Sequence, residues 1–296
     1  MRRARPLLGT LVEIGAAGKN AGGGIDAAFR EIETVHRRMS FHEAESDVSR
    51  INRASPGEIL PIDHRTYEVL SCAQLMSRLS AGAFDVTVGG RLAEEGFLPR
   101  PHGSQFFDRN VSFEDIVLLS RNSVTLKRQA WIDLGGIAKG YAVDRAVMAL
   151  KKCEVASGIV NAGGDLFVFG DSQPVHVRHP GDASLVFPLG AIRDLAVASS
   201  SGCFSEHREP GAATDALIAP RRNLCVNWQR SVTVIASRCI IADALTKVVR
   251  LAPRRAKKIL SHFGAQALVI DRRGVRVFQS MESEAQSVVF SSMITS

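Results

Sequence analysis

A glycine-rich run followed by a helical pattern, at residues 131–145, constrains this chain more than any other segment. Gly135 and Gly136 stand side by side, and glycine allows either a positive φ or a close approach of the backbone to a ligand. The alanines that follow recur at helical spacing, which predicts a helix over residues 137–152. The N-terminus of a helix offers unpaired N–H groups and a partial positive charge, so with Lys139 close to it the segment indicates a phosphate site. The spacing matches neither the P-loop nor the dinucleotide fingerprint, and a plain strand-to-helix turn is the alternative.

The rest of the pattern predicts an α+β fold with mostly antiparallel strands, because strict alternation of strands and helices is missing. Helices are expected after residues 22–24, after residue 63 and from residue 241, with a surface loop over residues 99–110. Strands are expected over residues 7–14, 157–160, 166–169, 175–177, 185–189, 195–198 and 231–236, with a hairpin over 266–278. The chain of 296 residues is expected to form a single domain, as one body or as two intertwined lobes, with a poorly ordered tail over residues 280–296.

The net charge of +7 and the pI of about 9.5 raise the question of a polyanionic partner. The basic residues form short dispersed clusters without an aromatic-interleaved stripe, so a nucleic-acid partner is not expected. The five cysteines include no Cys-x-x-Cys pair, which argues against a structural zinc site and against a disulfide framework. No apolar run reaches membrane-spanning length and no signal-peptide core follows the N-terminal arginines. A cytoplasmic protein without a membrane partner is therefore expected.

Seven short motifs stand out along the chain. They are LGTLVEI at residues 8–14, FHEAESDVSRIN at 41–52, AFDVTVG at 83–89, WIDLGGIAKGYAVDR at 131–145, NAGGD at 161–165, SSG at 200–202 and IADALT at 241–246. As an ordered set, from residue 7 to about residue 250, they resemble the FAD:protein FMN transferases, the ApbE-type flavin transferases. The resemblance implies a T-fold-like α+β architecture, FAD as substrate or bound ligand, Mg²⁺ as cofactor, and an acceptor flavoprotein as partner.

Asp243 and Thr246 lie three residues apart on one face of a predicted helix, where a carboxylate and a hydroxyl suit Mg²⁺. The resemblance implies the same two residues as metal ligands, together with the backbone oxygen of Gly136. The spacing also fits a simpler interpretation, in which Asp243 is an acid in the first helical turn that stabilises the helix dipole.

The resemblance further implies a set of flavin contacts: Leu8, Phe41, Ala83, Phe84, Asp85, Asp133, Lys139 and Ile218. Packing or turn formation offers a second interpretation of these residues. Phe41 and Phe84 also suit a hydrophobic core, and Asp85 suits the cap of a turn. Asn161 and Asp165, on either side of two glycines, suit a tight connection between two strands.

Two departures from the family pattern concern the chemistry. Lys247 stands where the family has a metal-ligating Thr. Its ammonium group either replaces part of the cation charge, or displaces the metal, or forms an ordinary ion pair with Asp243 one turn away. The family motif His-x-x-Asp-Pro is replaced at residues 216–220, where Ala216 and Ala219 stand for the two polar groups. The catalytic base is therefore unknown, although Asp215 and His207 are close in the sequence.

These departures leave two functions open. The first is a Mg²⁺-dependent transferase, which moves FMN from FAD to a Ser or Thr of an acceptor protein and releases AMP. The second is a catalytically impaired FAD-binding homologue, which acts as a flavin carrier or an interaction subunit. A Lys247 side chain that points into the site would also make phosphate binding less dependent on Mg²⁺.

Overall fold

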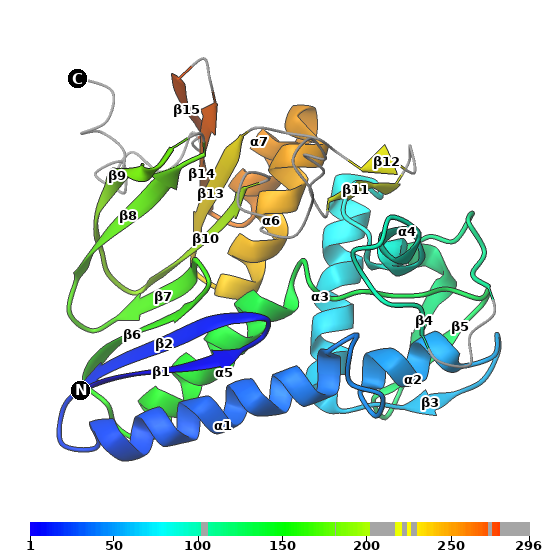
Figure 1. Ribbon diagram of the computed structural model, residues 1–296, viewed down its shortest axis with the longest axis horizontal. Helices are drawn as coiled ribbons and strands as arrows, with labels where there is room; N and C mark the ends of the chain where they lie inside the picture. Colours follow the sequence, from blue (N-terminus) through cyan, green and yellow to red (C-terminus); the bar gives the residue numbers. More distant parts are fainter. Residues whose placement is uncertain are drawn as a thin grey trace. The chain divides into compact units, whose positions relative to one another are not determined.

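The computed structural model describes residues 1–101, 106–180, 182–201, 217–220, 224–225, 230–271 and 274–278. The chain forms two compact units, and each is built from segments that are far apart in the sequence. The first unit contains residues 1–32, 139–215 and 227–296, and the second contains residues 33–138 and 216–226. Figure 1 labels the helices and strands of both.

An eight-stranded sheet is the framework of the first unit (Figure 1). Its order is β1-β2-β6-β7-β10-β13-β14-β15, and every neighbouring pair is antiparallel. The strands are β1 (Arg2–Leu7), β2 (Thr10–Ala17), β6 (Ser157–Ala162), β7 (Asp165–Phe169), β10 (Leu195–Ser201), β13 (Ser231–Ala236), β14 (Gln266–Asp271) and β15 (Gly274–Phe278). Antiparallel neighbours can be joined by two-residue turns, and β1–β2 and β6–β7 are joined in this way.

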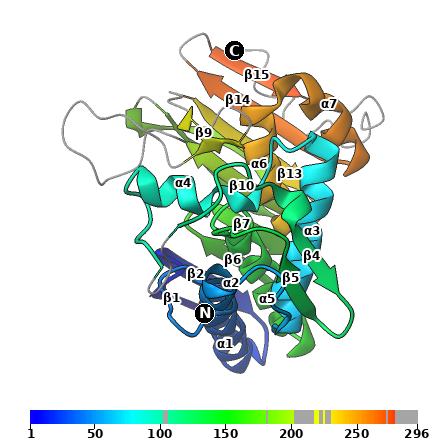
Figure 2. The ribbon, with the colours of Figure 1, turned by 90° about the vertical axis from the view of Figure 1, so that its right-hand side faces the viewer.

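Helices and a second hairpin pack against this sheet. The helix α6 (Cys239–Leu251) packs on β10 and β13, and α7 (Pro253–His262) packs on α6 and β14, as Figure 2 shows. The hairpin of β8 (Gln173–His179) and β9 (Asp182–Ile192) alternates buried and exposed residues along β8, so that Val175 and Val177 enter an apolar cluster with sheet residues such as Val197. The unit also contains α5 (Ala138–Lys152) from Lys139 onward, and residues 21–32 of α1 (Ala21–Met39).

The second unit is smaller, and apart from the 17-residue helix α3 its elements are short. A three-stranded sheet has the order β3-β5-β4, and a separate two-stranded ladder joins β11 to β12. The elements are α2 (Asp47–Arg53), β3 (Leu60–Pro61), α3 (His64–Ser80), η1 (Val86–Val88), α4 (Gly89–Glu94), η2 (Phe113–Asp115), β4 (Ile116–Leu119), β5 (Ser123–Leu126), β11 (Ile218–Ala219) and β12 (Leu224–Cys225). Ser46 caps α2 by accepting from the Ser49 N–H at 3.0 Å, and Asp63 caps α3 by accepting from the Arg65 N–H at 2.9 Å.

The structure confirms the α+β class and most of the elements expected from the sequence. The helix expected over residues 137–152 is α5, and the C-terminal hairpin is β14–β15. The strand expected over residues 7–14 is wrong at its start, because Leu8 and Gly9 have φ values of 56° and 71° and form the turn between β1 and β2. The glycines at 22–24 lie inside α1 rather than before it. The tail at 280–296 lies outside the described residues.

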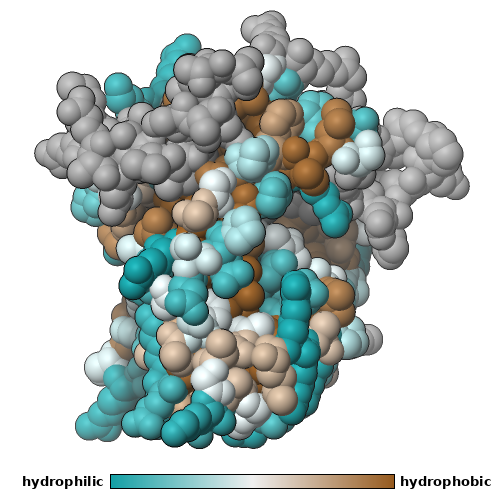
Figure 3. All heavy atoms as spheres, turned by 90° about the vertical axis from the view of Figure 1, so that its left-hand side faces the viewer, coloured by the Kyte–Doolittle hydropathy of each residue, from teal (hydrophilic) through white to brown (hydrophobic). Residues whose placement is uncertain are grey.

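The described surface mixes polar and apolar side chains. On the face shown in Figure 3, hydrophilic residues are interspersed among the hydrophobic ones. Within the described part of the chain, no helix is both long enough and apolar enough to cross a membrane.

Candidate functional site

The glycine-rich segment is a turn that leads directly into α5. Leu134 accepts hydrogen bonds from the N–H groups of Ile137 and Ala138, at 3.0 and 2.8 Å, and so begins the helix. Asp133 accepts from the Gly135 N–H at 3.1 Å and closes the turn from its own side chain. Neither Gly135 nor Gly136 has a positive φ. Backbone conformation therefore does not require glycine at these two positions, and a Cβ atom added at Gly135 would lie 3.0 Å from Oδ2 of Asp133.

Asn52 of α2 holds the strand-like residues that precede this turn. Its side-chain amide donates to the Ile132 carbonyl at 3.0 Å and accepts from the Ile132 N–H at 2.7 Å. Both residues are buried, so this pair of bonds satisfies backbone groups of Ile132 that water cannot reach. Asn52 belongs to one of the seven sequence motifs, but its role could not be found from spacing, because the partners are 80 residues apart.

Gly140 is the glycine that the packing requires. Its N–H donates to Oδ2 of Asp243 at 3.1 Å. A Cβ atom at this position would lie 2.3 Å from the carbonyl oxygen of Cys239 and 2.8 Å from Cβ of Asp243. Only glycine therefore lets α5 approach α6 closely enough for this hydrogen bond.

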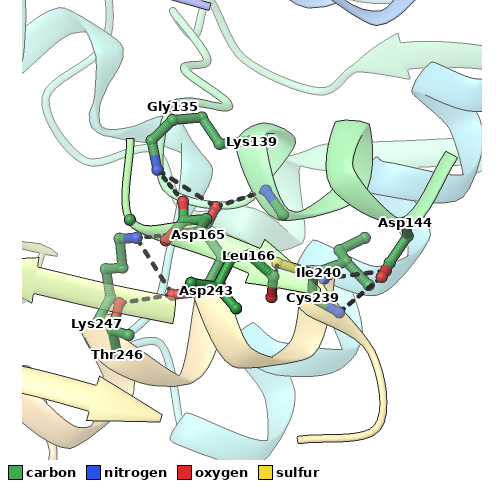
Figure 4. Close-up of polar contacts among 12 residues, drawn as sticks. Gly135, Lys139, Asp144, Asp165, Leu166, Cys239, Ile240, Asp243, Thr246 and Lys247 are labelled. Carbon is green, nitrogen blue, oxygen red and sulfur yellow. Dashed lines mark hydrogen bonds and ion pairs between the residues drawn. The ribbon is translucent and has the colours of Figure 1, made fainter. Parts of the chain in front are cut away.

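Four charged side chains meet in the first unit (Figure 4). They are Lys139 of α5, Asp165 at the start of β7, and Asp243 and Lys247 of α6. The ammonium group of Lys139 forms an ion pair with the Asp165 carboxylate and lies 3.8 Å from Oδ2 of Asp243. The ammonium group of Lys247 binds Oδ1 of Asp243 and lies 3.2 Å from the Asp243 carbonyl oxygen. The carboxylates are 1% and 0% exposed, whereas Lys139 is 29% and Lys247 15% exposed, so the lysines form the accessible edge of the cluster.

The cluster sets the protonation of its members. Burial would raise the pKa of Asp243, but the ammonium groups of Lys139 and Lys247 and the Gly140 N–H together hold that pKa below its ordinary value. Burial and the neighbouring Asp243 charge raise the pKa of Asp165. Burial would lower the pKa of Lys139, but the two carboxylates raise it well above its ordinary value. Lys139 is therefore held as a fixed positive charge.

A tight turn brings Asp165 to this cluster. Gly163 and Gly164 have φ values of 63° and 98°, and they join β6 to β7. Asn161 accepts from the Gly164 N–H at 2.9 Å and shapes the turn. The two polar residues of this motif thus have different roles: Asn161 stabilises the connection, and Asp165 pairs with Lys139.

Asp144 of α5 caps the N-terminus of α6. Its two carboxylate oxygens accept from the N–H groups of Cys239 and Ile240, at 2.7 and 3.1 Å. The residue at the N-cap position, Arg238, makes no side-chain cap bond. Burial raises the pKa of Asp144 although both N–H bonds and Arg238 oppose the shift. This contact between the two helices fixes the place from which Asp243 projects, and it joins residues too far apart in the chain for spacing to reveal it.

The donor set at Asp243 does not match the expected magnesium site. Both carboxylate oxygens of Asp243 accept from N–H groups, and the Thr246 hydroxyl donates to the Asp243 carbonyl at 2.7 Å. No group of three or more His, Cys, Asp or Glu side chains suited to a metal occurs among the described residues. The residues present do not fit a divalent ion while Lys247 occupies Oδ1. The ligand set of Gly136, Asp243 and Thr246 stays a prediction.

The remaining predicted flavin contacts are distributed over both units. Leu8 lies in the first unit, in the β1–β2 turn, where a φ of 56° is strained for a side chain of this kind. The others lie in the second unit, and Phe41 and Phe84 are buried there. Asp85 caps η1 by accepting from the Thr87 N–H at 2.9 Å, and it also accepts from the Phe113 N–H at 2.9 Å. The capping interpretation of Asp85 therefore holds, whereas its flavin contact stays a prediction.

Of the predicted site residues, the structure brings together Lys139, Asp243 and Thr246. Lys139 belongs to one sequence motif and Asp243 with Thr246 to a second, and Asp165 adds a third motif to the same cluster. The ApbE family matches residues 8–269 of the chain.

This chain belongs to the ApbE family.

Individual relatives agree with this assignment. The FAD:protein FMN transferase of Vibrio cholerae is 28% identical over 231 residues, which are 73% of this chain and 69% of that protein. The FAD:protein FMN transferase of Treponema pallidum is 25% identical over 302 residues, which are 90% of this chain and 83% of that protein. The crystal structure of the ApbE protein of Thermotoga maritima has a TM-score of 0.80 with 26% identity, and the match covers 98% of each chain.

The two departures from the family pattern that the sequence indicates are at Lys247 and at residues 216–220. Lys247 points toward Asp243 and is mostly buried, so it is part of the cluster rather than a solvated lysine. Ile218 and Ala219 form β11 in the second unit, and Ile218 is buried. Ala216, Asp215 and His207 lie outside the described residues, so the catalytic base stays unassigned.

Proposed function

We propose that this protein is an FAD:protein FMN transferase, which moves FMN from FAD to a Ser or Thr of an acceptor protein and releases AMP. Membership of the ApbE family and the names of the matched relatives support the reaction. The single observation that supports a role for particular residues in this reaction is the cluster of Lys139, Asp165, Asp243 and Lys247. Residues from 139–144, 161–165 and 242–247 of the first unit meet there, and two ammonium groups lie at its accessible edge.

The proposed reaction requires fixed charge and correct positioning more than covalent chemistry. The acceptor oxygen attacks the FMN phosphorus, the bond to the AMP phosphate breaks, and the hydroxyl proton leaves for a base. Lys139, held by Asp165, and Lys247, held by Asp243, would neutralise the phosphate oxygens. Gly140 and Asp144 would act as positioning residues, because they fix α5 against α6.

A second candidate function is a flavin carrier with little chemistry. The observation that favours it is the pair Ala216 and Ala219, where the resembled family has ionisable side chains. FAD would then bind to the same cluster, but transfer would be slow because the acceptor hydroxyl lacks a base. A protein of this second kind could also act as an interaction subunit that binds FAD without transferring FMN.

The reaction is tested by incubating the protein with FAD, Mg²⁺ and candidate acceptor flavoproteins. Mass spectrometry of the acceptor is expected to show covalently attached FMN, and chromatography is expected to show an equal amount of AMP. The variant Lys139→Met is expected to lose at least about tenfold in rate, a loss of about 1.4 kcal/mol in transition-state stabilisation. Bound FAD without adduct or AMP would support the carrier, and Ala216→His should then raise transfer. No FAD binding at all would contradict both functions.

The other assignments stay predictions within this proposal. They are the flavin contacts of the second unit, the acceptor flavoprotein and the cytoplasmic location. The divalent cofactor differs from these assignments, because the hydrogen bonds to both Asp243 oxygens affect whether an ion can bind there.

A further inference from the structure

Lys247 occupies the position next to Asp243 that a cation would need. It lies one helical turn after Asp243 on α6, and its ammonium group binds Oδ1 and approaches the carbonyl oxygen of the same residue at 3.2 Å. Its side chain is only 15% exposed. A lysine on a solvated helix face keeps its charged head in water, whereas this one directs its head into a buried cluster.

The charge of the cluster is already balanced. Asp165 and Asp243 supply two buried carboxylates, and Lys139 and Lys247 supply two ammonium groups. A divalent ion at Asp243 would stand beside both ammonium groups in a poorly solvated place, where like charges repel strongly. It would also compete with the N–H donor that each carboxylate oxygen of Asp243 already accepts. The arrangement therefore opposes a metal at this place.

The ammonium groups still have hydrogen-bonding capacity toward a ligand. Each carries three donors. Lys139 directs one to Asp165, and the two bonds of Lys247 both go to Asp243. Both lysines are partly exposed, and the remaining donors have no hydrogen bond to another of the residues that the structure describes. Phosphate oxygens are suitable acceptors for such donors.

We infer that Lys247 takes the place of a divalent cation at Asp243, so that the diphosphate of FAD binds to Lys139 and Lys247 without a metal. This inference rests on the proposed function, because FAD is the ligand. Lys247 is thus a binding residue. Its ammonium group supplies the positive charge beside Asp243 that a divalent metal ion would otherwise supply.

The first test is direct metal binding in the absence of flavin. Mn²⁺ serves as the probe, because its paramagnetic resonance signal is lost on binding. The wild-type protein is expected to show no stoichiometric site, whereas Lys247→Thr, which exposes Oδ1 of Asp243 and adds a hydroxyl, is expected to gain one. Lys258→Thr is the matched control, because it makes the same change at an exposed position on α7. A stoichiometric Mn²⁺ site in the wild-type protein would overturn the inference.

The second test is the affinity for FAD in EDTA and in Mg²⁺, measured by titration of flavin fluorescence. For the wild-type protein and for Lys258→Thr, the two affinities are expected to agree within about twofold. For Lys247→Thr, the affinity in EDTA is expected to fall by about tenfold or more and to be restored by Mg²⁺, a difference of about 1.4 kcal/mol. Lys247→Met, which keeps the length but removes the charge, should lose affinity in EDTA without rescue by Mg²⁺.

The outcomes separate this inference from the proposed function. FAD binding by the wild-type protein only when Mg²⁺ is present would overturn the role of Lys247 and leave the transferase proposal standing. No FAD binding in either condition would contradict the proposed function and the inference together. Thermal unfolding of each variant checks its fold. If neither variant folds, Mn²⁺ binding by the wild-type protein and its FAD affinity in EDTA and in Mg²⁺ are sufficient to test the inference.

Discussion

Gly140 is the residue at which a single methyl group decides whether α5 and α6 can meet. A Cβ added there would lie 2.3 Å from the Cys239 carbonyl oxygen, which belongs to the backbone and cannot move aside as a flexible side chain can. Gly140→Ala is expected to lower the free energy of unfolding by about 1–3 kcal/mol or more. Urea unfolding followed by circular dichroism measures this loss.

Gly23→Ala is the matched control for that substitution. Gly23 is exposed in α1, and an added Cβ would meet nothing within 4 Å. The same change there is expected to raise the free energy of unfolding by about 0.5–1 kcal/mol, because alanine loses less backbone entropy than glycine in a helix. Equal effects at the two positions would contradict the close approach of α5 to α6.

The candidate site could be predicted from the sequence only where its residues are close in the chain or belong to a motif. Lys139 is predicted because helical spacing places it after the glycines, and Asp243 with Thr246 because three residues separate them. The pairing of Lys139 with Asp165 spans 26 residues and that of Gly140 with Asp243 spans 103. No local pattern records such contacts, so the direction of Lys247 could be established only from the fold.

At the scale of elements, the capping of α6 by Asp144 joins two helices of the site. Asp144→Ala removes the acceptor for the N–H groups of Cys239 and Ile240, and we expect a loss of about 1–2 kcal/mol in the free energy of unfolding. Asp144→Asn keeps one acceptor oxygen, and burial already disfavours the charge of Asp144, so a smaller loss is expected. Because α6 carries Asp243, the alanine variant should also weaken FAD binding. Unchanged unfolding midpoints for both variants would show that the cap does not stabilise α6.

The elements themselves could be predicted best where one period dominates. The helix α5 and the strands β6, β7 and β13 follow clear helical or alternating patterns or short apolar runs. The short strands β3, β4 and β5 were missed because two to four residues do not establish a period. The helix α7 was missed because its basic residues resemble dispersed surface charge, although Ala256, Ile259 and Leu260 form its buried face. The break at Leu8 was missed because a positive φ is unexpected for leucine.

At the scale of the whole molecule, the ordered motifs predicted the family, and the α+β pattern predicted the fold class. The order of strands in the large sheet could not be predicted. β10, for example, pairs with β7, although β8 and β9 lie between these two strands in the chain. Pairing of this kind depends on the packing of the whole sheet rather than on any local sequence signal.

The central claim is that the cluster of Lys139, Asp165, Asp243 and Lys247 binds the phosphates of FAD. It is tested most directly by calorimetric titration of the double variant Lys139→Met/Asp165→Asn with FAD and with riboflavin. The double change removes a buried ion pair as a unit, so neither partner is left uncompensated. Riboflavin carries no phosphate and serves as the internal control. The account predicts that the affinity for FAD falls by about tenfold or more, about 1.4 kcal/mol, while the affinity for riboflavin is unchanged. An affinity for FAD equal to that of the wild-type protein would contradict it.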